Sequence, residues 1–210
     1  MKEKIIFVDF RKEHEFELLQ LWRESFHKAI GIKEDTREEV VNEHLEFLQS
    51  LNPCFIRVAL EKNDNKVIGF MRKEGNLIEQ LFVHVDYQSK GLGSLFINQA
   101  KEEEEFLTLS TFESNKRAQK FYEFHDFKIV RRGFASFEGN PWATNKEQLA
   151  DIHYEWKRYH LMLGANLNTV FTAISAIYLS LELLKKNTLK MDSLNESEKI
   201  LHFEQLLLLK

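Results

Sequence analysis

The chain has 210 residues, of which 43% are hydrophobic and 30% charged, enough to bury one full core and a small annex. Lys and Arg total 29 against 33 Asp and Glu, giving a net charge of −4 without a basic block, so we expect no nucleic-acid partner. The single cysteine, Cys54, excludes an internal disulfide, and the charged N-terminus leads into a run too short for a signal sequence, so we expect a cytoplasmic protein.

The N-terminal segment predicts one strand and two helices. Residues 5–8 are strand-like, and residues 15–29 carry apolar side chains at helical spacing. A second helix is expected to begin after Asp35 or Thr36, either of which can cap it. The Asn-Pro pair at 52–53 is expected to end that helix.

A meander of three strands is predicted next. The strands cover residues 55–60, 66–72 and 77–85, and the turns between them lie at 62–65 and 74–76. Turns this short are expected to join each strand to the next as a hairpin.

The third strand of the meander runs into a turn with two glycines, and a helical pattern opens directly after it. Unpaired amides at such a junction point at one spot, where the helix N-terminus favours an anion. Gly91 and Gly93 let the backbone adopt positive φ and approach a ligand closely. The pattern predicts a phosphate-binding loop, although an ordinary turn has a similar sequence. A NAD-type loop is excluded because Phe96 stands where a third glycine is needed, and a Walker-type loop is excluded because no Gly-Lys-Ser or Gly-Lys-Thr follows.

Further strand and helix patterns follow the loop. A strand is expected over 106–112, a helix over 115–123, a strand over 127–133 and a last strand over 151–156.

Two motifs in this order and spacing resemble the GNAT family of acetyl-CoA-dependent N-acyltransferases. The first is Gln/Arg-x-x-Gly-x-Gly/Ala, present at residues 88–93, and the second is Asn-x-x-Ala-x-x-Phe-Tyr-Glu, present at residues 115–123. The surrounding elements fit the family from the N-terminus to about residue 160, so the resemblance implies a GNAT domain over 1–160 and a helical extension over 161–210.

The fold that the resemblance implies is α/β (α+β), and it begins with two helices followed by a meander. Its central sheet is mixed and mostly antiparallel, with helices on its sides. One parallel pair, the strands that hold 81–85 and 107–111, splays apart at its C-terminal ends. The gap between them receives the thioester of the coenzyme.

The resemblance also implies a set of coenzyme-binding residues. The pantetheine arm is expected to pair with the backbone of the strand before the loop, and the pyrophosphate to meet the loop amides. Asn115 either contacts the coenzyme or caps the helix that it opens. The implied residues are Phe82, Val83, Val85, Gln88, Ser89, Lys90, Gly91, Leu92, Gly93, Ser94, Asn115, Ala118 and Tyr122. No metal is implied.

Catalysis would need a proton donor for the leaving thiolate and an acceptor for the amine proton. By the resemblance Tyr122 is the acid, and the alternative is a core tyrosine with a backbone partner. Glu79 is the candidate base, either reaching into the cleft near a bulge or solvated at the strand edge. His27 and His84 are further candidate bases, and a hydrogen-bonded core histidine is the alternative for each.

The chain departs from the family pattern at two positions. Asp126 stands where a glycine usually follows the second motif, which predicts a strained left-handed residue, and Val85 replaces a usual proline.

His153 and Glu155 share a strand face without further metal ligands, so pairing or solvation is expected. Trp142 and Phe134 either line the acceptor pocket or only pack.

Residues after about 160 have no counterpart in the family core. Apolar residues from Leu163 to Leu184 alternate four and three apart, as in a coiled-coil seam. Residues 195–210 are one candidate partner helix, a second chain in a homodimer is another, and docking on the same chain's core is the third. A membrane span over 161–184 is disfavoured by its polar residues.

The function implied is transfer of an acetyl group from acetyl-CoA to a small amine or a peptide amine, by direct attack in a ternary complex. The alternative from another class is a GNAT-shaped module that binds acyl-CoA or a protein partner without turnover. The resemblance does not identify the acceptor.

Overall fold

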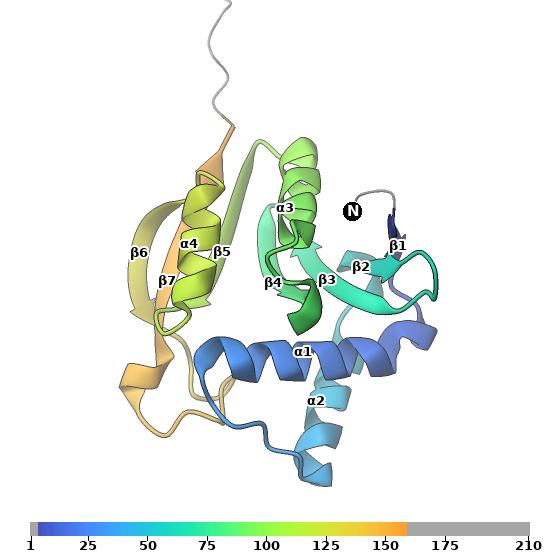
Figure 1. Cartoon of the computed structure of the whole chain (residues 1–210). Helices are drawn as coiled ribbons and strands as arrows, with labels where there is room; N and C mark the ends of the chain where they lie inside the picture. Colours follow the sequence, from blue (N-terminus) through green and yellow to red (C-terminus); the bar gives the residue numbers. More distant parts are fainter. Residues whose placement is uncertain (1–3, 159–210) are drawn as a thin grey trace, which may run out of the picture. The chain divides into compact units, whose positions relative to one another are not determined.

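A seven-stranded sheet forms the centre of the computed structural model, which describes residues 4–158 (Figure 1). The strand order is β1-β2-β3-β4-β5-β7-β6. All neighbouring pairs are antiparallel except β4–β5, which is parallel. The predicted fold class is therefore confirmed. The strands are β1 (Ile5–Asp9), β2 (Ile56–Glu61), β3 (Val67–Glu74), β4 (Leu77–Val83), β5 (Phe106–Phe112), β6 (Lys128–Phe134) and β7 (Ala150–Lys157).

Four α-helices pack on this sheet within the described residues. They are α1 (Glu15–Ile30), α2 (Glu38–Ser50), α3 (Leu92–Glu103) and α4 (Lys116–Phe124). Helix α1 contacts β3 and β4 and crosses the lower end of β4 in Figure 1, whereas α3 contacts β3, β4 and β5. None of the described helices is long and apolar enough to cross a membrane. The predicted coiled-coil seam, its partner helix and the disfavoured span all lie outside the described residues.

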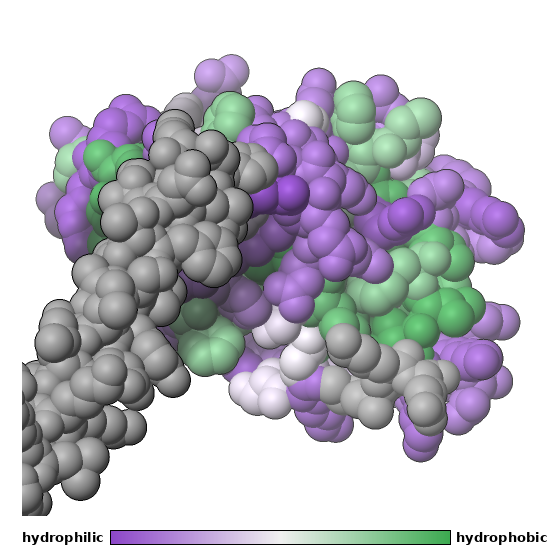
Figure 2. All heavy atoms as spheres, turned by 90° about the horizontal axis from the view of Figure 1, so that it is seen from above, coloured by the Kyte–Doolittle hydropathy of each residue, from purple (hydrophilic) through white to green (hydrophobic). Residues whose placement is uncertain are grey.

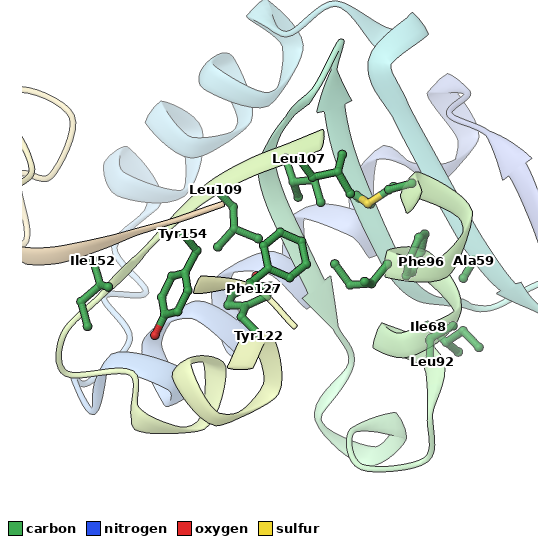
Figure 3. Packing of buried hydrophobic residues seen from close by; sticks show 14 residues of the cluster. Ala59, Ile68, Leu92, Phe96, Leu107, Leu109, Tyr122, Phe127, Ile152 and Tyr154 are labelled. Atoms are coloured by element: carbon green, nitrogen blue, oxygen red, sulfur yellow. The ribbon is translucent and has the colours of Figure 1, made fainter. Parts of the chain in front are cut away.

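The sheet has a hydrophobic core on each face. Because side chains alternate along a strand, Val58 and Leu60 of β2 join the core that contains α1 and α2, and Ala59 joins the core that contains α3 and α4. Figure 3 shows the second core, in which Tyr122 lies beside Tyr154. The face seen in Figure 2 is mainly hydrophilic, with hydrophobic residues gathered near its right-hand edge.

The start of α2 differs from the prediction. Its N-cap is Arg37, and neither Asp35 nor Thr36 caps it. Asp35 Oδ1 instead accepts the backbone N–H of Arg37 at 3.1 Å, and the two side chains form an ion pair at 2.6 Å. Asp35 lies two residues before the N-cap, and its carboxylate is engaged by Arg37 and not by the first amides of the helix.

Strands β4 and β5 are parallel but pair over a short length. Their register contains Leu77 with Thr108 and Ile78 with Leu109, and the strands then separate, as predicted. Strand β4 ends at Val83, earlier than predicted, because His84 caps a short 3-10 turn at Val85–Tyr87 by accepting the N–H of Asp86. This divergence opens the sheet between the two predicted motifs.

Candidate functional site

The predicted phosphate loop links β4 to α3. Gly91 is the N-cap of α3 with φ 87°, and Ser89 also has positive φ, at 59°. Leu95 N–H donates to the Gly91 carbonyl at 3.1 Å, so the amides of residues 92–94 have no acceptor within the helix. These amides and the positive end of the helix dipole face the loop, which is the geometry of an anion site.

Gly93 has a different role from the one predicted. It lies inside α3 without positive φ, so the expectation of a left-handed backbone there is wrong. A Cβ at Gly93 would lie 3.1 Å from Cζ of Phe121 on α4. Gly93 therefore allows α3 and α4 to approach closely, and Gly91 alone of the two supplies the left-handed turn.

Arg117 is a loop contact that was absent from the predicted set. Its guanidinium donates to Ser89 Oγ at 2.8 Å and also to Gln88 Oε1. The available signal was its position two residues after Asn115, which puts it in the first turn of α4. Lys90 Nζ lies 5.3 Å from the centre of the Tyr87 ring. Two cationic side chains, those of Arg117 and Lys90, thus lie at the loop.

The backbone of β4 offers fewer free groups than predicted. His84 N–H donates to the Ile68 carbonyl at 2.9 Å, so by antiparallel alternation Phe82 also pairs with β3, whereas Leu81 and Val83 direct their groups towards the gap. The Val83 carbonyl accepts hydrogen bonds from Ser25 Oγ at 3.0 Å and Gln88 Nε2 at 2.9 Å. The expected pairing through Phe82 is therefore wrong, and Val85 lies beyond the strand.

The cleft next to this gap has a volume of about 970 Å³. Its walls come from α1, α2, the splayed parts of β4 and β5, the start of α4 and the segment 135–142. Trp142 lines it and packs on Phe112 with ring centres 5.3 Å apart. Phe134 does not line the cleft. Its side chain is exposed, and Lys146 Nζ lies 4.4 Å from the centre of its ring.

Tyr122 lies at the wall of this cleft, as do Asn115 and Ala118. Its residue surface is 8% exposed, and burial raises the pKa of its phenol above the ordinary value. The ring packs on Phe127 and Tyr154, with centres 5.7 Å and 5.9 Å away. Among the described residues no hydrogen-bond partner engages its hydroxyl, so the expected alternative of a backbone partner is not found there.

Asn115 caps α4. Its Oδ1 accepts the N–H of Ala118 at 3.0 Å, which satisfies one of the first amides of the helix. The cap function is therefore present, and the role of Asn115 and Ala118 towards a coenzyme stays a prediction.

Glu79 lies at the bulge that the sequence suggested. The register between β3 and β4 shifts between Arg72 and Lys73, which leaves Glu79 as the extra residue on β4. Its carboxylate lines the cleft and forms an ion pair with Arg72, whose residue surface is 8% exposed. Glu79 therefore balances a buried cation as well as facing the cleft.

The two candidate histidines are held by protein groups. His27 Nδ1 lies 2.6 Å from the Arg23 carbonyl in the same helix, although the residue lines the cleft. His84 caps the turn after β4. Both contacts fit structural histidines better than free bases.

A polar group across β5 and β7 was only partly foreseen. His153 Nδ1 lies 2.8 Å from Ser110 Oγ, and its Nε2 lies 3.1 Å from Asp151 Oδ2. Glu155 forms an ion pair with Lys157 at 2.8 Å. Pairing or solvation was expected for His153 and for Glu155, and each is paired, although not with the other. Asp151 was not singled out, because its partner and its burial depend on tertiary structure.

Comparisons with known proteins agree with this geometry. The family model described as Acetyltransferase (GNAT) domain matches residues 53–129. The peptidyl-lysine N-acetyltransferase YjaB of Salmonella typhimurium is 28% identical over 134 residues, which cover 63% of this chain and 89% of that protein.

Two solved structures show the same fold. The solution structure of apo-form YjaB from Escherichia coli aligns with a TM-score of 0.57 and 23% identity, covering 72% of this chain and 97% of that one. The PaiA N-acetyltransferase from Thermoplasma acidophilum, in complex with coenzyme A, aligns with a TM-score of 0.50 and 20% identity, covering 73% and 98%. The seven-stranded sheet thus has the fold of these solved structures, and residues 53–129 are similar to the GNAT acetyltransferase domain.

Proposed function

We propose that this protein transfers an acetyl group from acetyl-CoA to a primary amine by direct attack in a ternary complex. The observation that carries the proposal is the position of Tyr122 on the wall of the cleft where β4 and β5 separate. The names of the relatives support it, since one is a peptidyl-lysine N-acetyltransferase and another was solved with coenzyme A.

Binding of the coenzyme is assigned to the loop and to the edge of β4. The amides of residues 92–94 and the side chains of Arg117 and Lys90 would hold the pyrophosphate, because they combine free donors with positive charge. The outward groups of Leu81 and the N–H of Val83 would pair with the amides of the pantetheine arm, since the Val83 carbonyl is already engaged.

The reaction forms a C–N bond and breaks a C–S bond. The neutral amine attacks the thioester carbonyl carbon, and the thiolate leaves with the electrons of the C–S bond. Tyr122 donates its phenolic proton to that thiolate and regains a proton from solvent. The raised pKa keeps its hydroxyl protonated at neutral pH. The proton that the amine loses passes to Glu79 directly or through water.

The pairing of Glu79 with Arg72 limits what this base contributes. A carboxylate in an ion pair with a buried guanidinium is a weaker proton acceptor than a free one. Positioning of the amine and the thioester is therefore expected to supply more of the rate than proton abstraction does.

The test is calorimetric titration of the full chain with acetyl-CoA, followed by a panel of primary amines with free thiol measured over time. Binding together with amine-dependent thiol release is the expected result. Binding without release for any amine would favour an acyl-CoA-binding module. Absence of binding would overturn the assignment of the loop.

A further inference from the structure

One carboxylate oxygen in the cleft wall lacks a protein partner. The residue surface of Asp151 is 9% exposed, and the residue lines the cleft. Its Oδ2 lies 3.1 Å from His153 Nε2, whereas Oδ1 is buried and, among the described residues, accepts no hydrogen bond. A buried acceptor of this kind loses its water without replacement, which is costly unless a ligand supplies a donor.

The surroundings of Asp151 hold the carboxylate in place, and Oδ1 lies buried beside Gly133 without a donor from the described residues. Ser110 Oγ lies 2.8 Å from the other nitrogen of His153, Nδ1. When Nε2 carries the proton that it donates to Oδ2, Arg131 Nη2 at 2.9 Å is a neighbouring cation and not its hydrogen-bond donor. Gly133 faces Asp151 across β6 and β7, and a Cβ there would lie 3.1 Å from Oδ1. The glycine therefore provides the space in which this oxygen lies.

Asp151 is distant from the point where β4 and β5 separate. In the sheet it pairs with Phe112, which is three residues beyond Leu109, the last residue of β5 in register with β4. Three residues of strand correspond to about 10 Å. Asp151 therefore lies further along the sheet from that point of separation than Glu79, which lies beside it.

The charge of the cleft favours a cation. Within the described residues its lining carboxylates outnumber its Lys and Arg side chains by six to three. Two of those three cations are already paired, Arg37 with Asp35 and Arg23 with Glu34. Gln80 Oε1 is a second buried acceptor without a partner among the described residues, and Gln80 also lines the cleft. Unused acceptors and negative charge are complementary to a donor-rich cationic ligand.

We propose that the acceptor is a cationic molecule with two amino groups, and that Asp151 Oδ1 binds the ammonium that is not acetylated. This assignment rests on the proposed acetyltransferase function and gives its substrate class. Asp151 would act as a specificity-determining residue, whereas His153 would act as a positioning residue that holds Oδ2.

The test compares α,ω-diamines of three to eight carbons with the n-alkylamines of the same lengths, in the full chain and in Asp151→Asn. For the best length we expect kcat/KM of the diamine to exceed that of the monoamine at least tenfold, as for a hydrogen bond to a charged group. That ratio exceeds the statistical factor of two for two equivalent amines. In Asp151→Asn the preference should disappear through a higher KM, while acetyl-CoA affinity is kept.

Asp64→Asn provides the matched control, because Asp64 is an exposed carboxylate in the β2–β3 turn and is not a cleft residue. It should keep the diamine preference. Gly133→Ala provides a second variant, since the added Cβ displaces Oδ1, and it should reduce the preference without removing the charge. Folding of each variant is checked by circular dichroism.

A binding measurement separates this proposal from the proposed function. Diamine is titrated into protein saturated with coenzyme A and followed by calorimetry. Diamine binding that depends on Asp151 but occurs without any acetylation would support the subsite and reject the transferase. Equal kcat/KM for diamines and monoamines at every length, or a preference retained in Asp151→Asn, would overturn the subsite while leaving the transferase intact.

Discussion

The guanidinium of Arg117 donates a hydrogen bond to the hydroxyl of Ser89 at 2.8 Å and so connects the first turn of α4 to the loop before α3. The second donor of the same side chain bonds Gln88. Ser89 has positive φ, which is unusual for a residue with a side chain, and the fork of Arg117 supports this conformation. The two family motifs are thus joined by direct contact.

Replacement of Arg117 by Gln should weaken acetyl-CoA binding about tenfold, because a charge-assisted contact is lost at the proposed pyrophosphate site. Arg117→Lys should restore part of the affinity, since it keeps the charge without the planar fork. Calorimetry gives the dissociation constants. Arg57→Gln is the control, because Arg57 forms an exposed ion pair with Asp9 at 2.6 Å and does not line the cleft. An Arg117→Gln protein with wild-type affinity would contradict the assignment.

Gly91→Val should abolish acetyl-CoA binding and lower the free energy of unfolding by about 1–3 kcal/mol, because a β-branched residue is strained at φ 87°. Gly75→Val is a matched control. Gly75 has φ 55° in the β3–β4 turn, and no atom lies within 4 Å of the place that a Cβ would take, so the substitution strains the backbone away from the loop. Urea unfolding should show comparable losses for both variants, whereas calorimetry should show lost binding for Gly91→Val only. Loss of binding in both would mean that destabilisation alone explains the effect.

Tyr122→Phe should reduce kcat by about 10²–10⁴-fold, the range for loss of a general acid, while acetyl-CoA affinity stays unchanged. Tyr154→Phe is the control, because it also removes a phenolic hydroxyl next to the same core, one that donates to Glu123 at 3.3 Å. Steady-state thiol release measures both variants. Wild-type turnover in Tyr122→Phe would show that Tyr122 only packs.

Stability should fall on acidification from about pH 7.5 to about pH 5.5. Burial lowers the pKa of His14 and of His125 below 6.5, and the nearby Lys101 adds to the effect at His125. The unfolded chain therefore takes up protons in this range before the folded protein does, which favours unfolding as pH decreases. Urea unfolding at both pH values checks the trend, and His125→Gln should show a smaller loss. A stability that rises towards pH 5.5 would contradict these pKa directions.

Local patterns were sufficient to predict the elements and the loop. The hydrophobic periodicity predicted the helices and strands, and the resemblance carried by the two motifs implied the parallel pair and the left-handed Asp126, whose φ is 61°. The bulge next to Glu79 was one of the two alternatives for that residue. Each depends on neighbours in the chain or on a recurring motif. Roles that depend on contacts between residues distant in sequence could not be predicted in this way.

Three residues illustrate that limit. Position 93 requires a glycine because the Phe121 ring, 28 residues later in the sequence, packs against it. Arg117 contacts Ser89, which lies 28 residues earlier. His153 engages Oδ2 of Asp151, and Oδ1 lies beside Gly133, which has no side chain to donate to it. In each case the sequence shows the residue type, and only the packing of two elements shows what it contacts.

The engaged carbonyl of Val83 has a consequence for how the opened sheet behaves towards other chains. Where β4 leaves β5, its backbone becomes a strand edge, and such edges recruit extended segments of other proteins. Ser25 and Gln88 occupy both lone pairs of that carbonyl, so a foreign strand has no acceptor there without displacing one of them. The engaged carbonyl thus hinders pairing with a foreign strand at Val83, while the outward groups of Leu81 stay accessible.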